Sequence, residues 1–218
     1  MNHAILSASG AHRWMACPPS ARLELQFPTT TTEYAEEGRF AHALAVLKLS
    51  RAVTNTIKPS VYRKRLAEMQ KHPMYSQAME EHIDYYVSQV AELFLARKKQ
   101  CLDALVLLEQ RLDFSTWVPE GFGTGDVVII SDGSVEIVDL KYGKGVPVSA
   151  EGNPQTRLYG LGAIATYEML YDFSRVRMTI IQPRLENTST EELTVEELLT
   201  WAEEELKPKA QLAFAGEG

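Results

Sequence analysis

Cysteine is scarce in this chain, and long apolar runs are missing from it. Only Cys17 and Cys101 occur among 218 residues, which excludes a disulfide framework and leaves too few thiols for a four-cysteine metal site. No stretch approaches 18 consecutive apolar residues, and the first residues lack the basic and apolar segments of an export signal. We therefore expect a soluble, intracellular protein without membrane contact.

Positive charge is also in short supply. Lysine and arginine number 22 against 29 aspartates and glutamates, a net charge of −7, which argues against tight nonspecific binding of nucleic acid by the bare protein. Bound cations would weaken that objection. With 45% hydrophobic and 23% charged residues, the chain suits one domain over residues 1–218, with a helical region at about 51–101 inserted before a sheet.

The segment from Thr124 to Tyr142 is typical of a β-hairpin. Two runs rich in valine and isoleucine flank Asp132-Gly133, and glycine readily takes the positive φ that a tight turn needs. If the loop is symmetric, Asp126 faces Asp139 directly across the two strands. Because side chains alternate along a strand, one face then carries Asp126, Val128, Ile130, Val135, Ile137, Asp139 and Lys141.

Two carboxylates opposed across a hairpin favour a bound cation. Their Cβ atoms lie roughly 4.5–5.5 Å apart, and like charges there destabilise a sheet by up to about 1 kcal/mol, whereas Mg²⁺ and Mn²⁺ prefer carboxylate oxygens. In metal-assisted phosphodiester hydrolysis, the Lys141 ammonium would orient a water or stabilise developing charge. The alternative is a half-buried hairpin whose aspartates merely mark strand ends. A three-residue loop or a bulge would also break the register.

A helix predicted over residues 33–50 supplies a histidine. Its apolar stripe, at spacings of three or four, consists of Ala35, Gly38, His42, Val46 and Leu49. His42 therefore lies on the predicted buried face, either as a ligand or as a core histidine bonded to a neighbour. Glu37 lies about 140° away around the helix, so the two cannot easily share one ligand set.

The remaining pattern predicts alternating helices and strands. Residues 51–73 are basic and loosely patterned, either a solvated face or a contact for a phosphate backbone. Thr194-x-x-Glu197 is a capping box for a final helix that breaks at Pro208. Helices are predicted at about 75–100, 154–171 and 194–214, and strands at about 105–114 and 175–182. This order indicates an α/β sandwich around a small mixed sheet.

Four motifs occur in a set order along the chain. They are E-G-x-x-x-H at Glu37, Gly38 and His42, G-D at Gly125 and Asp126, D-x-K at Asp139, Leu140 and Lys141, and Q-x-x-x-Y at Gln155 and Tyr159. Together they resemble the RecB-type branch of the PD-(D/E)xK nuclease superfamily. The segments SASGAHRWMACP and DLKYGKG are also similar to a family of phage and prophage exonucleases.

The resemblance implies a fold and an activity. The fold would be a restriction-endonuclease-like α/β core, a small mixed sheet flanked by helices. The activity would be that of a metal-dependent deoxyribonuclease, an exonuclease acting in phage DNA replication, recombination or repair in the bacterial cytoplasm. Mg²⁺ or Mn²⁺ would be its cofactor, DNA its substrate, and phage recombination or replication proteins its partners.

The resemblance also implies roles residue by residue. Metal ligands would be His42, Asp126, Asp139 and the backbone carbonyl of Leu140. Lys141 would position the attacking water, and Gln155 and Tyr159 would orient the site or hold a DNA phosphate. Glu37 would brace its helix.

One feature of some RecB-type nucleases is incomplete in this sequence. An iron–sulfur cluster in those proteins uses a cysteine before proline near the N-terminus, matched by Cys17-Pro18, and three cysteines near the C-terminus, which have no counterpart here. Either the cluster is absent from this protein or the chain stops before it. We predict no iron–sulfur cluster in this chain and a packing role for Cys17.

Two further classes fit the same residues. The protein could be a non-catalytic nucleic-acid-binding or assembly subunit on the same fold, because fold does not fix function. It could also be a structural protein in which the hairpin carboxylates are incidental.

Overall fold

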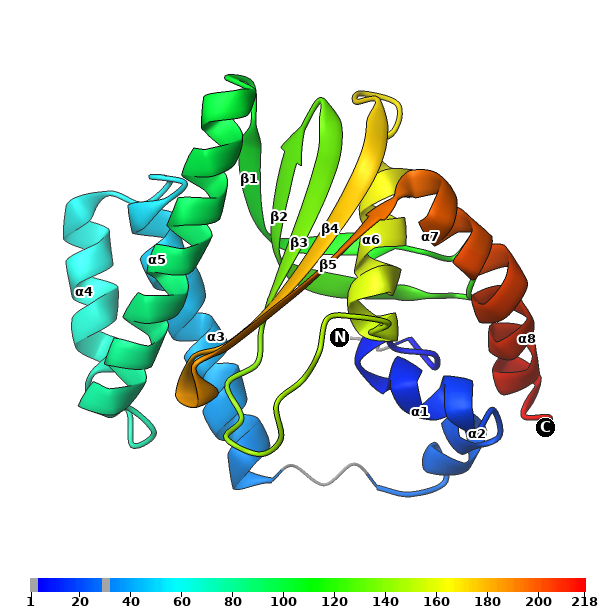
Figure 1. Ribbon diagram of the computed structural model, residues 1–218. Coiled ribbons are helices and arrows are strands. Elements are labelled where there is room, and N and C mark those ends of the chain that lie inside the picture. The colour runs from blue at the N-terminus through cyan, green and yellow to red at the C-terminus, as the bar shows by residue number, and fades with distance from the viewer. Residues whose placement is uncertain (1–3, 29–31) are drawn as a thin grey trace.

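The computed structural model describes residues 4–28 and 32–218 and has a five-stranded mixed sheet at its centre (Figure 1). Its strands lie side by side in chain order: β1 (Leu105–Asp113), β2 (Phe122–Ser131), β3 (Gly133–Leu140), β4 (Phe173–Gln182) and β5 (Asn187–Thr194). Neighbouring strands are antiparallel, except that β3 and β4 are parallel. The predicted mixed α/β architecture is confirmed.

Helices cover both faces of this sheet (Figure 1). On one face lie α3 (Glu33–Ala52) and α5 (Gln77–Gln100), with α4 (Pro59–Met69) packed against α3. The other face is covered by α6 (Pro154–Tyr167), α7 (Val195–Trp201) and α8 (Lys207–Ala215), together with the short α1 (Ala11–Ala16) and α2 (Ser20–Glu24). No helix in the described ranges is long and apolar enough to cross a membrane.

The sheet therefore separates two hydrophobic cores. The core on the α6 side contains Val128, Val135 and Ile137, and the core on the α3 side contains Val127, Ile129 and Val138. Short 3₁₀ turns occur at Ala8–Gly10 and Pro183–Leu185. Because both faces of β2 and β3 are buried, the sequences of these strands are nearly continuous apolar runs.

Two predicted helices end differently from expectation. The helix predicted over 154–171 ends at Tyr167. The helix predicted over 194–214 starts with the expected capping box of Thr194 and Glu197, but it does not break at Pro208. A π-helical segment, Ala202–Leu206, joins α7 to α8. Pro208 then lies in the first turn of α8, where its missing N–H does little harm.

The hairpin of β2 and β3 has the predicted register near its turn. Ile130 pairs with Val135, Val128 pairs with Ile137, and Gly133 adopts a φ of 78°. The ladder ends at Val127 and Val138, one position before the predicted pair of Asp126 and Asp139. The predicted register is thus confirmed as far as the ladder extends, and the predicted pair of aspartates lies just beyond its end.

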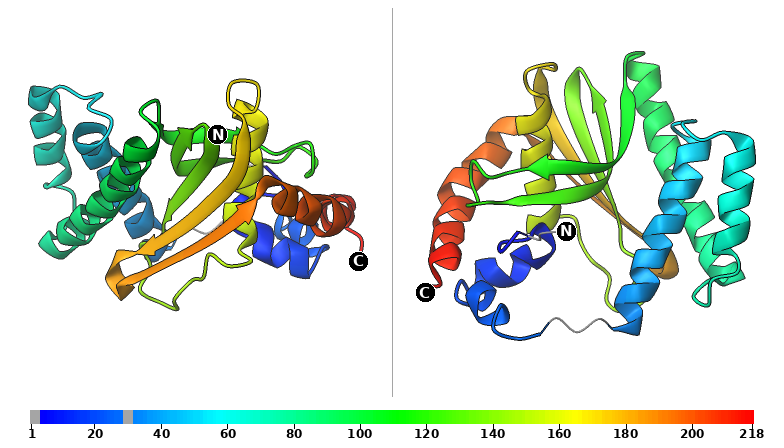
Figure 2. Two further views of the ribbon diagram at one scale, coloured as in Figure 1. Left: turned by 45° about the horizontal axis from the view of Figure 1, so that its top comes forward. Right: turned by 180° about the vertical axis from the view of Figure 1, so that it is seen from behind.

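A reversal of facing at Asp126 explains why the ladder ends there. A Cβ atom on Gly125 would lie 2.9 Å from Leu112 Cδ1 in the α6-side core, and Val128 belongs to the same core. Val127 belongs to the α3-side core, and Asp126 contacts His42 of α3, so both residues lie on the α3 side and the usual alternation of faces is broken between them. The prediction that Asp126 shares a face with Val128 and Ile130 is thus wrong. Figure 2 shows β1 and β2 curving in this region.

The crossover helix α6 is held at its N-terminus and at its middle. Asn153 caps its N-terminus by accepting the N–H of Gln155 at 3.0 Å. Arg157 donates to Glu191 of β5 at 2.6 and 2.9 Å, a buried bidentate pair that fixes α6 in register with the sheet. Gly162 allows close approach of β1, because a Cβ there would lie 2.9 Å from the Leu112 Cβ. These contacts hold Gln155 and Tyr159 beside β3.

Candidate active site

Asp126 uses both carboxylate oxygens within the protein. Its Oδ1 lies 3.1 Å from Nδ1 of His42 on α3, and its Oδ2 accepts the backbone N–H of Leu140 at 2.8 Å. The second bond takes the place of the next ladder rung between β2 and β3. Asp126 therefore links α3 to the end of β3, where Asp139 and Lys141 follow.

Asp139, Lys141, Gln155 and Tyr159 form a connected polar group between β3 and α6. The Lys141 ammonium lies 2.7 Å from Asp139 Oδ2 and donates to Gln155 Oε1 at 2.8 Å. The Gln155 amide donates to Asp139 Oδ1 and to the Tyr159 hydroxyl, both at 3.4 Å. The two strands and two helices thus bring six of the predicted site residues, His42 and Asp126 included, into one region.

The carboxyl group of Asp139 is buried. Its side chain is only 4% exposed, and burial raises the pKa of its carboxyl, while Lys141 opposes this shift and the charge of Asp126 adds to it. Among the described residues, Asp139 Oδ2 has no hydrogen-bond donor in favourable geometry despite the nearby ammonium. The Lys141 ammonium, 2.7 Å from this oxygen, supplies the opposite charge that a buried carboxylate needs.

His42 differs from its prediction, because its side chain is 35% exposed rather than on the buried face. The buried face of α3 is formed by Ala41, Leu44, Ala45, Lys48 and Leu49. Of the predicted stripe, Leu49 is buried as expected, whereas Ala35, Gly38, His42 and Val46 line a cavity of about 780 Å³. Burial lowers the pKa of His42, but the hydrogen bond to Asp126 and the charges of the nearby carboxylates reverse this and raise it.

Two residues near the site were not predicted from the sequence. Glu109 lies on β1, lines the His42 cavity and has a left-handed φ of 50°. Burial and the charge of Asp126 raise the pKa of its carboxyl. Tyr86 of α5 is 1% exposed, and its hydroxyl has no hydrogen-bond partner in the described ranges. Burial and the charges of Asp126, Asp139 and Glu109 raise the Tyr86 pKa.

Glu37 and Cys17 lie outside this group. Glu37 accepts a hydrogen bond from Arg184 at 2.9 Å, which ties α3 to the turn after β4 and is compatible with the predicted bracing role. Cys17 is exposed, so its predicted packing role is wrong. It directly follows the last residue of α1.

The side chains of the candidate site carry the kinds of ligand atom that a hard divalent ion prefers. In this structure they are not arranged to chelate one. One imidazole, two carboxylates and the Leu140 carbonyl are nitrogen and oxygen donors of the kind that Mg²⁺ and Mn²⁺ accept. In residues 4–28 and 32–218, however, no three histidine, cysteine, aspartate or glutamate side chains are gathered closely enough to hold a metal ion. The contact with His42 Nδ1 occupies Asp126 Oδ1, one of the oxygens that would bind the metal.

Comparison with known proteins places the chain in a family. A solved structure described as "Crystal structure of SSO0001" is 13% identical over 95% of this chain and 87% of that chain, with a TM-score of 0.26, a likeness that supports no conclusion on fold or function. A family model described as "Protein of unknown function (DUF2800)" matches residues 3–218. The chain therefore belongs to the DUF2800 family.

Proposed function

We propose that this protein is a metal-dependent deoxyribonuclease of the RecB-type branch of the PD-(D/E)xK superfamily. It would act as an exonuclease in phage DNA replication, recombination or repair in the bacterial cytoplasm. The observation that carries the proposal is the position of Lys141, whose ammonium lies 2.7 Å from the buried Asp139 and is held by Gln155 at 2.8 Å. A lysine and a buried carboxylate held together in this way at the end of a strand suit phosphodiester hydrolysis better than packing.

The sheet supports a restriction-endonuclease-like core. A three-stranded antiparallel unit, β1 to β3, is followed by the crossover helix α6 and by β4 parallel to β3. The motif residues lie at the end of β3 and on the first turns of α6, where a substrate phosphate could reach them together.

Each side chain has a chemical task in this proposal. Mg²⁺ or Mn²⁺, held by Asp126, Asp139, His42 and the Leu140 carbonyl, would neutralise phosphoryl charge and make water more acidic. The Lys141 ammonium has three N–H donors, and Gln155 and Asp139 direct two of them. The third is free to orient a water or to stabilise charge on a phosphate oxygen.

Tyr159 and His42 complete the set. Burial and the charge of Asp139 raise the pKa of Tyr159, so its hydroxyl stays protonated at neutral pH and can donate to a phosphate oxygen. His42 must give up its 3.1 Å contact with Asp126 Oδ1 for both groups to face one cation. A raised pKa of His42 means that protonation competes with metal binding.

A second candidate is a nucleic-acid-binding subunit that does not cleave. One observation that favours it is the direct contact of His42 with Asp126. Another is that no three metal-binding side chains are grouped together in the described residues. This candidate predicts salt-sensitive DNA binding without metal-dependent cleavage.

The test of the proposed function is digestion of end-labelled linear DNA beside a closed circle of the same sequence. With Mg²⁺ or Mn²⁺ the wild-type protein should degrade the linear molecule progressively from its ends and spare the circle, because an exonuclease requires an end. A chelator should stop the reaction. Intact linear DNA with both metals would refute the nuclease proposal, whereas cleavage of the circle would refute only its exonuclease part.

A further inference from the structure

The strongest concentration of positive charge on this acidic protein lies outside the candidate active site. Residues 58–72, here called the basic arm, contain five lysines and arginines and one carboxylate, Glu68, in a chain of net charge −7. The arm consists of α4 with its flanking residues, and α4 buries none of its side chains. Its five cations are all exposed: Lys58, Arg63, Lys64, Arg65 and Lys71.

These cations are not used to stabilise the fold. None of the five takes part in an ion pair with the described residues, whereas Lys48, Arg157 and Arg184 each pair with a carboxylate at 2.6–2.9 Å. The arm is therefore available to an external polyanion, such as a chain of phosphates.

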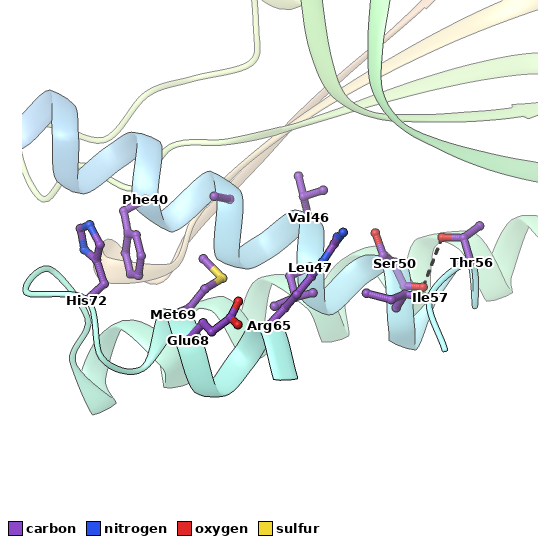
Figure 3. A pocket seen from close by; sticks show the side chains of 11 residues that line it. Phe40, Val46, Leu47, Ser50, Thr56, Ile57, Arg65, Glu68, Met69 and His72 are labelled. Atoms are coloured by element: carbon purple, nitrogen blue, oxygen red, sulfur yellow. Dashed lines mark hydrogen bonds between the residues drawn. The ribbon is translucent and has the colours of Figure 1, made fainter. Parts of the chain in front are cut away.

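A cavity between α3 and the arm adds a surface for flat rings (Figure 3). It has a volume of about 620 Å³ and is lined by Leu47, Met69 and Arg65, among others. At one end, the His72 ring stacks on Phe40 with centroids 4.4 Å apart and an interplanar angle of 15°. His72 is exposed, so one face of its ring is available for stacking with a base.

This cavity neighbours the one beside the candidate active site. Ala43 and Val46 of α3 line both cavities, and the second also contains His42 and Glu109. The two cavities thus lie next to each other along α3, and the second one includes His42, which contacts Asp126 at 3.1 Å.

We propose that the basic arm binds a single-stranded segment of the nucleic-acid substrate and leads it to the active site. The cations contact successive phosphates, and an unpaired base enters the cavity beside Phe40 and His72. A base within a duplex is covered by its neighbours and cannot enter such a cavity, which favours a single strand. The inference rests on the proposed nuclease function and specifies the form of its substrate.

The test measures binding separately from cleavage. Fluorescence anisotropy of a labelled single-stranded oligodeoxynucleotide is followed in the presence of a chelator, so that no hydrolysis occurs. The double variant Arg63→Ala/Lys64→Ala should bind about 10-fold more weakly than wild type, with a salt slope that is less steep by about 1.4, since each lost contact removes about 0.7. The single variant His72→Ala should lose roughly 5- to 100-fold through lost stacking.

A matched control removes the same charge elsewhere. Lys207 and Lys209 lie on α8, on the other side of the sheet from α4 (Figure 1), and Lys207→Ala/Lys209→Ala should bind the oligonucleotide nearly as wild type does. Circular dichroism should show unchanged folding of all three variants, because every mutated side chain is exposed or half-exposed.

Several outcomes would overturn the inference. Unchanged binding by the arm variants would do so, even if the wild-type protein cleaves DNA. An equal loss of affinity for a duplex would refute the preference for a single strand. Competition by polyglutamate as effective as that by the oligonucleotide would show a nonspecific anion surface. Conversely, strand binding lost in the arm variants, without cleavage by the wild type, would support the arm and refute the nuclease.

Discussion

Replacement of Lys141 by alanine should lower the rate of DNA cleavage by about 100- to 1000-fold, the usual effect of removing one preorganised donor to a transition state. The reason is local, since the ammonium is held 2.7 Å from Asp139 and 2.8 Å from Gln155. Single-turnover digestion of end-labelled linear DNA with saturating Mg²⁺ would measure the effect without a contribution from product release.

Lys144→Ala supplies the matched control. Lys144 lies three residues further along and is exposed, so its loss changes net charge equally without touching Asp139. It should retain most of the wild-type rate. If Lys141 has only a structural role as the partner of a buried carboxylate, the Lys141 variant will unfold at lower urea concentration and yet cleave at nearly the wild-type rate. That combination would contradict the catalytic role.

Replacement of Lys48 by alanine should destabilise the fold by about 3 kcal/mol. Lys48 is 5% exposed, and its ammonium donates to Glu80 at 2.7 Å and to Asp84 at 2.6 Å. Glu80 has a 14% exposed side chain; it would keep its hydrogen bonds from Tyr75 and Gln70 but lose its opposite charge, and removing one partner of a buried ion pair costs about 3–5 kcal/mol. Urea unfolding followed by circular dichroism measures this change. The exposed i,i+4 pair of Lys209 with Glu205 is the control, and Lys209→Ala should cost less than about 1 kcal/mol.

The pH dependence of stability follows from the same contacts. Burial lowers the pKa of Lys48, but its bonds to Asp84 and Glu80 more than reverse this and raise it above its ordinary 10.5. The contribution of Lys48 is thus complete below pH 10.5 and is lost as the pH rises through the higher folded value. Burial raises the pKa of Glu80, but the bonds from Lys48 and Tyr75 lower it below 4.5.

The contribution of Glu80 is therefore present above pH 4.5 and is lost on acidification. The difference in unfolding free energy between wild type and Lys48→Ala should be largest between these limits and should shrink on both sides. A difference that stays constant from acid to alkaline pH would mean that lost packing, rather than lost charge pairing, destabilises the variant.

Local sequence patterns predicted the hairpin well, because a two-residue turn around Asp132-Gly133 fixes pairing over the adjacent residues. They did not predict the reversal of facing at Asp126. That reversal depends on contacts of Gly123 and Gly125 with residues far away in sequence. The strand β5 was missed because it is polar, with Leu193 as its one apolar residue, and its identity comes from pairing with β4.

The sequence predicted which motif residues form the candidate site. It did not predict all of the residues that surround them. His42 was placed on the wrong face, since a stripe of small residues such as Ala35 and Gly38 resembles a core face in sequence but lines a cavity in the fold. Glu109 and Asp126 lie between two pairs of the β1 and β2 register, Leu108 with Val127 and Gln110 with Gly125. No short turn connects these strands, so this register cannot be read from sequence. Tyr86 lies in the helix predicted over residues 75–100, and no motif singled it out.

The central claim is that Asp126 and Asp139 bind one divalent metal ion. A crystal of the protein grown with Mn²⁺, measured at a wavelength where manganese scatters anomalously, tests it most directly. We expect one anomalous peak in contact with both carboxylates, and His42 Nδ1 moved from Asp126 Oδ1 to the metal. An empty site at saturating Mn²⁺, with His42 still 3.1 Å from Asp126, would contradict the claim.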